Sequence, residues 1–274
     1  MDFIANKARD FRELHVIQKI ATDNHAAEAD FYLTSSPFCS SLLAPDGESL
    51  SDWAFAHLFE VEKKIRLPAV NLRKTLDDLH IGYVDWFKAD TQGLDLRLFK
   101  NMGNRQQGTI VADLEPGFIN AYRGEDKIAD MLAYMTDLPF WLCSFMPGGN
   151  QKMNIGLLEN AFSAAEISNI RDRTATAAVF AGATYVNNFK EAPLQTERGY
   201  LLGCVCALVL KQYGFAAELA LKGRALTGNP LFEDIISHIK ESTKKASLRT
   251  LLSRPGLLKT KIINTLIRKL DQAR

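Results

Sequence analysis

Three acidic residues follow two segments that have the pattern of neighbouring strands. Asp90 directly follows the segment YVDWFKA, and Glu115 follows the segment TIVADL. Asp95 lies about one helical turn beyond Asp90, with Gly93 between them. Ligands of open parallel sheets bind beyond the carboxyl ends of the strands. Carboxylates at such a place can take the proton of a substrate hydroxyl, bind a cationic ligand or hold a divalent ion.

The same residues also have a purely structural interpretation. Aspartate is a preferred N-cap where a strand leads into a helix, because its side chain accepts hydrogen bonds from the first backbone N–H groups. Gly93 allows either a sharp turn or the close approach of a ligand. Other catalytic signatures are missing, since the sequence has no G-x-S-x-G or phosphate-loop motif and its seventeen glycines never stand two apart.

The elements that must position these acids alternate between strands and helices up to about residue 158. We expect strands at 14–20, 29–34, 61–70, 83–89, 109–114 and 140–146, and helices at 71–79, 94–102 and 126–135. This alternation favours parallel βαβ units and an α/β sheet. Pro68 favours an edge position for the third of these strands, because proline has no N–H to donate to a neighbour.

Residues 159–274 are expected to form a second, helical domain. Apolar residues three and four apart predict helices at about 163–180, 196–212, 215–226, 230–243 and 257–271. The last helix is amphipathic and basic, with Leu258, Ile262 and Leu266 on one face. We expect residues 255–274 either to lie on an anionic membrane surface or to pack that face on their own domain. No aromatic residue interrupts this basic stretch, so nucleic acid is not an expected partner.

Composition narrows the class of protein. The chain has 274 residues, 47% hydrophobic and 24% charged, with a formal net charge of +1. These values exclude disordered, collagen-like and disulfide-scaffold proteins. The longest uncharged apolar run, at 199–210, is shorter than the roughly 20 residues that span a bilayer. Early charges leave no room for a signal peptide, which predicts a cytoplasmic protein, and the cysteines and histidines lack metal-ligand spacing.

Two of these segments carry a resemblance to a known family. LRKTLDDL at 72–79 and VDWFKADTQGLD at 84–95 resemble the FkbM family of S-adenosylmethionine-dependent methyltransferases. The usual pattern of that family is T-L-D, a short gap, and then D-hydrophobic-[LI]-K-[IVA]-D-[VT]-E-G-x-[ED]. Looser matches are IATD at 20–23, SSL at 40–42 and VADLE at 111–115. The resemblance covers about residues 10–158.

This resemblance implies a class I, Rossmann-like methyltransferase domain over residues 1–158. Such an enzyme moves a methyl group from S-adenosylmethionine to a hydroxyl of a sugar, glycan or similar metabolite. The resemblance places Asp90, Asp95 and Glu115 in the catalytic crevice, with Asp90 as general base or substrate orienter. It places Thr22, Asp23 and Gly93 at the cofactor.

The sequence departs from the family pattern at two places. Gln92 stands where the family usually has Glu, which removes one negative charge from the crevice. The glycine-rich loop and the acid that follow the first two strands of the family are not found, so the sequence resembles a family member without its first section. The alternative interpretation is therefore a catalytically inactive remnant that serves as a binding or interaction module, with the helical half as its working part.

Overall fold

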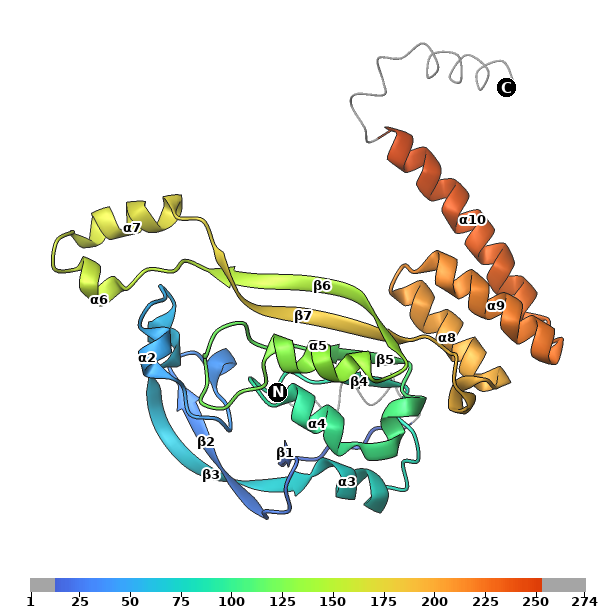
Figure 1. Ribbon diagram of the computed structural model, residues 1–274, viewed down its shortest axis with the longest axis horizontal. Coiled ribbons are helices and arrows are strands. Elements are labelled where there is room, and N and C mark those ends of the chain that lie inside the picture. Colours follow the sequence, from blue (N-terminus) through green and yellow to red (C-terminus); the bar gives the residue numbers. More distant parts are fainter. Residues whose placement is uncertain (1–12, 253–274) are drawn as a thin grey trace, which may run out of the picture. The chain divides into compact units, whose positions relative to one another are not determined.

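The computed structural model describes residues 13–252, with side chains up to residue 244, and divides into two compact units (Figure 1). The units are Met1–Lys190 and Glu191–Arg274. The boundary expected at residue 158 is therefore corrected, because strand β7 (Ala177–Asn187) belongs to the first unit. Alanine-rich sequence at 177–183 favours a helix locally, but pairing with a strand on each edge makes it a strand.

A small sheet is formed by β1 (Ile20–Thr22), β2 (Glu28–Thr34) and β3 (Val61–Asn71). Its order is β1-β3-β2, with β1 parallel and β2 antiparallel to β3. Strand β1 thus begins at Ile20, the last residue of the strand predicted at 14–20. The edge position expected from Pro68 is wrong, because β3 is central. Pro68 is tolerated there because pairing with β1 begins only at the next residue, Ala69.

The larger sheet has the order β4-β5-β7-β6. It contains β4 (Trp86–Lys88), β5 (Val111–Leu114) and β6 (Phe140–Asn150) beside β7. Strands β4 and β5 are parallel as expected, but β7 runs antiparallel to both of its neighbours, so the sheet is mixed. Strand β6 continues through the Pro-Gly-Gly segment predicted to end it. Helices α6 (Ile155–Leu158) and α7 (Ala164–Arg173) connect β6 to β7, and Figure 1 shows them at the far end of this long pair.

One face of this larger sheet forms the main core of the first unit. Phe87, Ala112 and Tyr185 are paired in register on β4, β5 and β7, so all three point to that face. Helices α4 (Asp95–Asn101) and α5 (Ile128–Thr136) pack against it. The remaining short elements of the unit are η2 (Pro37–Cys39), α2 (Gly47–Leu50), η3 (Ala56–Phe59), α3 (Leu72–Asp78) and η4 (Gly103–Gly108).

The second unit is helical, as predicted. It contains η5 (Ala192–Leu194), α8 (Glu197–Val209), α9 (Tyr213–Thr227) and α10 (Leu231–Leu252). The buried Phe232 ring packs directly on Gly223, where a Cβ atom would lie 2.3 Å from the ring. None of the described helices is both long enough and apolar enough to cross a bilayer. The predicted basic helix at 257–271 lies outside the described residues.

Candidate functional site

A cavity of about 330 Å³ lies beyond the carboxyl ends of β4 and β5. We call it the aromatic cavity. Rings from four segments of the chain form much of its wall: Phe38, Phe55, Phe59, Tyr122 and Phe180. Its three charged lining residues are all acids: Asp90, Glu115 and Glu125. Because no Lys or Arg is among the described lining residues, the cavity is suited to a neutral or cationic ligand.

Asp90 and Glu115 are brought to this one cavity, as the order of the strands suggested. Burial raises the pKa of the half-buried Glu115 carboxyl, and the nearby charges of Asp90 and Asp95 raise it further. The Asp90 side chain is exposed, and the Gln92 side-chain amide donates a hydrogen bond to it at 2.7 Å. Glu115 thus holds a proton more readily than an ordinary glutamate, which suits a group that gives and takes protons.

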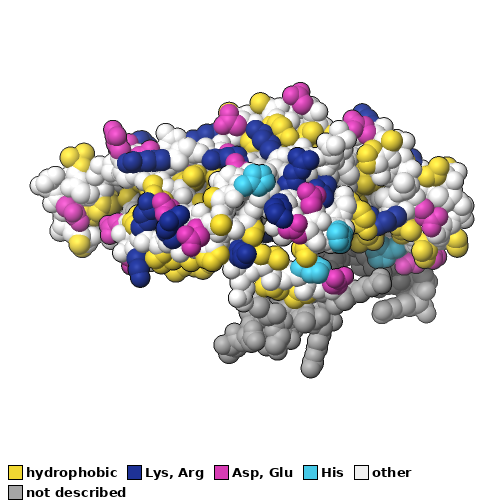
Figure 2. Space-filling view, turned by 90° about the horizontal axis from the view of Figure 1, so that it is seen from below, with side chains coloured by type: hydrophobic (Ala, Val, Ile, Leu, Met, Phe, Trp, Pro, Cys, Tyr) yellow, Lys and Arg dark blue, Asp and Glu magenta, His cyan; other side chains and the backbone are white. Residues whose placement is uncertain are grey.

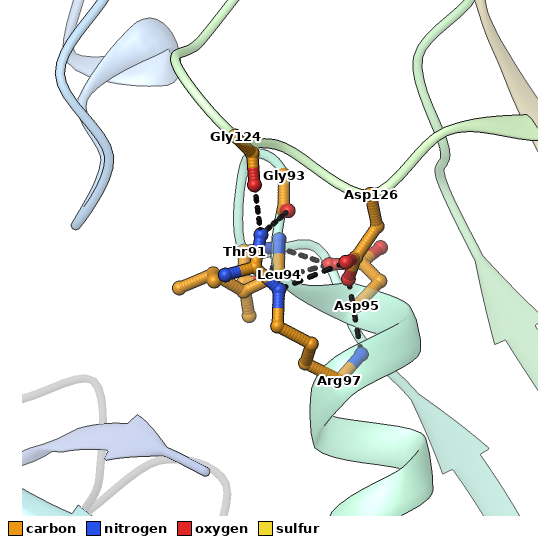
Figure 3. A network of polar contacts seen from close by, with 7 residues as sticks. All are labelled: Thr91, Gly93, Leu94, Asp95, Arg97, Gly124 and Asp126. Carbon is orange, nitrogen blue, oxygen red and sulfur yellow. Dashed lines mark hydrogen bonds and ion pairs between the residues drawn. The ribbon is translucent and has the colours of Figure 1, made fainter. Parts of the chain in front are cut away.

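Asp95 is not part of the cavity lining, and it is only 3% exposed. Its Oδ1 accepts a hydrogen bond from the backbone N–H of Thr91 at 2.9 Å, and its Oδ2 accepts one from the backbone N–H of Glu115 at 2.8 Å. Figure 3 shows this carboxylate beside Thr91 at the start of α4. Asp95 is not the N-cap of that helix, since Leu94 holds that place. It joins the loop after β4 to the loop after β5, and so positions Asp90 and Glu115.

The loop between Asp90 and α4 has an unusual backbone. Gln92 has φ 55° and Gly93 has φ 109°, both in the left-handed region. A Cβ atom at Gly93 would lie 2.9 Å from Cβ of Glu125, so the neighbouring loop alone already requires glycine there. The Tyr122 hydroxyl lies 3.2 Å from Oε1 of Gln92, which it can donate to. Strain of this kind is often concentrated at functional sites.

An ion pair anchors the loop that follows β5. The Arg97 guanidinium donates to Asp126 at 2.8 Å and also to the backbone carbonyl of Gly124 (Figure 3). The backbone N–H of Asp126 donates in turn to the carbonyl of Gly93 at 2.9 Å. These contacts fix the segment that carries Tyr122 into the aromatic cavity.

Thr22 and Asp23 lie elsewhere. The Thr22 hydroxyl is buried and is within 3.2 Å of the backbone carbonyls of Asn24 and Val70. Asp23 is exposed, and its backbone carbonyl accepts a hydrogen bond from Asn101. Neither residue lines the aromatic cavity, so of the three expected cofactor contacts the structure places only Gly93 there.

A second cavity, of about 400 Å³, lies over the sheet face opposite to α4 and α5. We call it the polar cavity after the polar strand residues that stand among its mostly apolar lining. Glu115 and Phe180 line both cavities. The Phe180 ring crosses β6 at Gly148, where a Cβ atom would lie 2.2 Å from the ring. This cavity was not predicted from the sequence, although Asp113, an acid inside the strand VADL, was a signal that one strand face is polar.

Two further observations concern metal-ligating groups and surface charge among the described residues. No group of three or more His, Cys, Asp or Glu side chains among them is placed to hold a metal ion. On the face drawn in Figure 2, Lys and Arg side chains are interspersed with Asp and Glu side chains.

Comparisons of the chain with protein-family models, with curated proteins and with solved structures find no match. The two cavities and the residues that line both of them, Glu115 and Phe180, are therefore the structural features that bear on function.

Proposed function

We propose that this chain is an S-adenosylmethionine-dependent methyltransferase that methylates a hydroxyl group of a sugar, glycan or similar metabolite. The observation that carries the proposal is the place of Glu115. This half-buried carboxyl, with its raised pKa, lies where the aromatic and polar cavities adjoin. A transfer between two bound molecules needs two adjacent sites and, for a hydroxyl acceptor, a base between them.

The arrangement of the larger sheet supports this proposal. Its order is β4-β5-β7-β6, with β4 and β5 parallel, so the loops that carry Asp90 and Glu115 leave the sheet at the same edge. The segment that resembles the FkbM family supplies β4 and the loop with Asp90 and Gly93. The resemblance to that family and the common edge of Asp90 and Glu115 are the two observations that support the proposal here.

The aromatic cavity is suited to the methyl donor. When bound, S-adenosylmethionine supplies a methyl group on a positively charged sulfur. Aromatic rings attract cations and stack on purines, and Phe59 and Tyr122 are neighbouring rings of this wall with centroids 5.5 Å apart. Asp90 and Glu115 would balance the charge of the sulfonium, and Gly93 would line the same wall.

Three residues of the chain have different roles in the proposed reaction. Glu115 would take the proton of the acceptor hydroxyl while that oxygen takes the methyl group from the donor, whose sulfur would keep the electron pair of the broken bond. Asp90, oriented by the amide of Gln92, accepts a hydrogen bond from the acceptor or balances charge. Asp95 is a positioning residue, since its hydrogen bond to the backbone of Glu115 holds the base between the cavities.

Calorimetric titration with S-adenosylhomocysteine tests the proposal. We expect micromolar binding by the whole chain, and at least tenfold weaker binding by Tyr122→Ala. The control is Asp78→Asn, which changes an exposed carboxylate on α3 paired with Lys74. A folded chain without detectable binding would refute the methyltransferase and favour an interaction module.

A further inference from the structure

A row of polar side chains crosses all four strands of the larger sheet. Lys88 of β4 pairs in register with Asp113 of β5, Asp113 pairs with Thr184 of β7, and Thr184 pairs with Ser144 of β6. Directly paired residues point to the same face. All four line the polar cavity, on the side of the sheet away from its apolar core. We call these four residues the polar row.

The polar row offers a dense set of hydrogen-bonding groups. The Thr184 hydroxyl donates to Oδ1 of Asp113 at 2.6 Å, and the Trp86 indole N–H donates to Oδ2 at 2.7 Å. A carboxylate can accept about four hydrogen bonds, and a hydroxyl can accept as well as donate. Asp113 and Thr184 therefore keep acceptor capacity toward the cavity, while Lys88 and Ser144 supply donors. Two central acceptors with a donor on each side suit the hydroxyl groups of a polyol, because a hydroxyl can both donate and accept.

Two exposed aromatic rings flank the row. Trp86 is 37% exposed and lies on the face of Lys88, two residues earlier in β4. Phe180 is 43% exposed and lines the cavity. Flat, amphipathic surfaces of this kind pack on the C–H faces of sugar rings while neighbouring polar groups bind the hydroxyls. The hydrogen bond to Asp113 holds the Trp86 ring in place.

The dimensions and charge of the row favour a chain of neutral sugars. Four adjacent strands span three spacings, or about 14 Å, which is longer than one sugar ring. Lys88 is the one Lys or Arg among the described residues that line the polar cavity, and it lies near the carboxylates of Asp113 and Glu115, so this lining has no excess positive charge to bind phosphates. Because Glu115 and Phe180 line both cavities, a chain bound along the row would reach the base.

We propose that the polar row is a subsite for a neutral oligosaccharide, and that it holds the sugar units next to the one that carries the reacting hydroxyl. This inference rests on the proposed function for the identity of the reaction. The binding of the oligosaccharide itself depends only on the row and its flanking rings, so the two can be tested apart.

The test applies the full chain to an array of neutral, sialylated and sulfated oligosaccharides with their monosaccharides, and measures S-adenosylhomocysteine binding in parallel. We expect retention of a neutral oligosaccharide, no retention of its monosaccharide, and at least tenfold weaker binding by the double variant Ser144→Ala/Thr184→Val. Circular dichroism shows whether that variant is folded. If it is not, Ser144→Ala alone, with an expected threefold or greater loss, replaces it. The control is Thr136→Val. The Thr136 hydroxyl donates to the backbone carbonyl of Leu132 in its own helix, α5.

Each outcome separates the two proposals. Oligosaccharide binding that the row variants weaken supports the subsite even if S-adenosylhomocysteine does not bind, and in that case methyl transfer alone is refuted. Donor-product binding without retention of any neutral oligosaccharide overturns the subsite alone. Retention that the row variants leave unchanged, or preferential retention of the sulfated sugars, also overturns it.

Discussion

The carboxylate of Asp95 accepts a hydrogen bond from the backbone N–H of Glu115 at 2.8 Å, across the gap between the carboxyl ends of two parallel strands. Its other oxygen accepts the backbone N–H of Thr91. One buried side chain therefore sets the distance between the loop of Asp90 and the loop of Glu115. Both cavities depend on that distance, because Glu115 lines each of them.

Replacing Asp95 should destabilise the first unit. Asp95→Ala leaves two backbone N–H groups without their charged acceptor, and we expect the free energy of unfolding to fall by about 3 kcal/mol. Urea denaturation followed by tryptophan fluorescence measures this loss. Asp78→Ala removes an exposed i,i+4 ion pair and should cost less than about 1 kcal/mol. Equal losses in the two variants would contradict the role given to Asp95.

Gly93→Ala tests whether the loop itself requires glycine. The new Cβ would meet Glu125 at 2.9 Å, on a backbone with φ 109°. We expect a loss of stability of about 1–3 kcal/mol, measured as a shift of the denaturation midpoint. Gly47→Ala is the matched control, since no atom lies within 4 Å of its added Cβ. It should be neutral or stabilise by up to about 1 kcal/mol. A neutral effect at Gly93 would mean that the loop adjusts freely.

The local sequence pattern was sufficient to predict those elements whose side-chain periodicity agrees with the sheet topology. The strand before Asp90, the helix after it and the strand before Glu115 lie where they were expected, because each has a buried face of regular period. Their common sheet edge followed from their parallel order. Asp95 shows the limit, since its spacing suggested a crevice residue or a cap, whereas one nearby backbone N–H, of Thr91, and one distant N–H, of Glu115, determine its buried position.

Pairing between strands that are far apart in the sequence accounts for the structural features that the sequence did not predict. Strand β7 is inserted between β5 and β6, and neither its reversed direction nor its partners can be predicted from local propensity. The polar row exists only after this insertion, because Thr184 must lie between Asp113 and Ser144. Thr22 and Asp23 were assigned from a loose match of four residues, and neither of them lines the aromatic cavity.

Glu115→Gln should change stability in a pH-dependent manner. Burial and the charges of Asp90 and Asp95 raise the pKa of Glu115 in the folded state, so ionisation of this group disfavours folding. At pH 7 we expect the variant to be more stable than the parent chain. The difference should shrink as the pH falls through the raised pKa, and vanish below the ordinary glutamate value. Denaturation midpoints at pH 4 to 8 measure it, with exposed Glu62→Gln as control. A difference that does not vary with pH would contradict the argument.

Asp90→Asn should lower the pKa of Glu115 toward its ordinary value. Burial would remain the main cause of the upward shift, but the largest charge contribution would be gone. A carboxyl ¹³C NMR titration of glutamate-labelled protein measures this pKa, with the Glu115 signal assigned from Glu115→Gln. If Glu115 is the base, methyl transfer should fall about 10²- to 10⁴-fold in Glu115→Gln, while Asp90→Asn moves the acid limb of the kcat/KM profile to lower pH. Asp78→Asn should leave both the pKa and the profile in place. A Glu115 pKa that stays fixed or rises in Asp90→Asn would show that the two carboxyls are not coupled, and the base would then have to be sought elsewhere in the aromatic cavity.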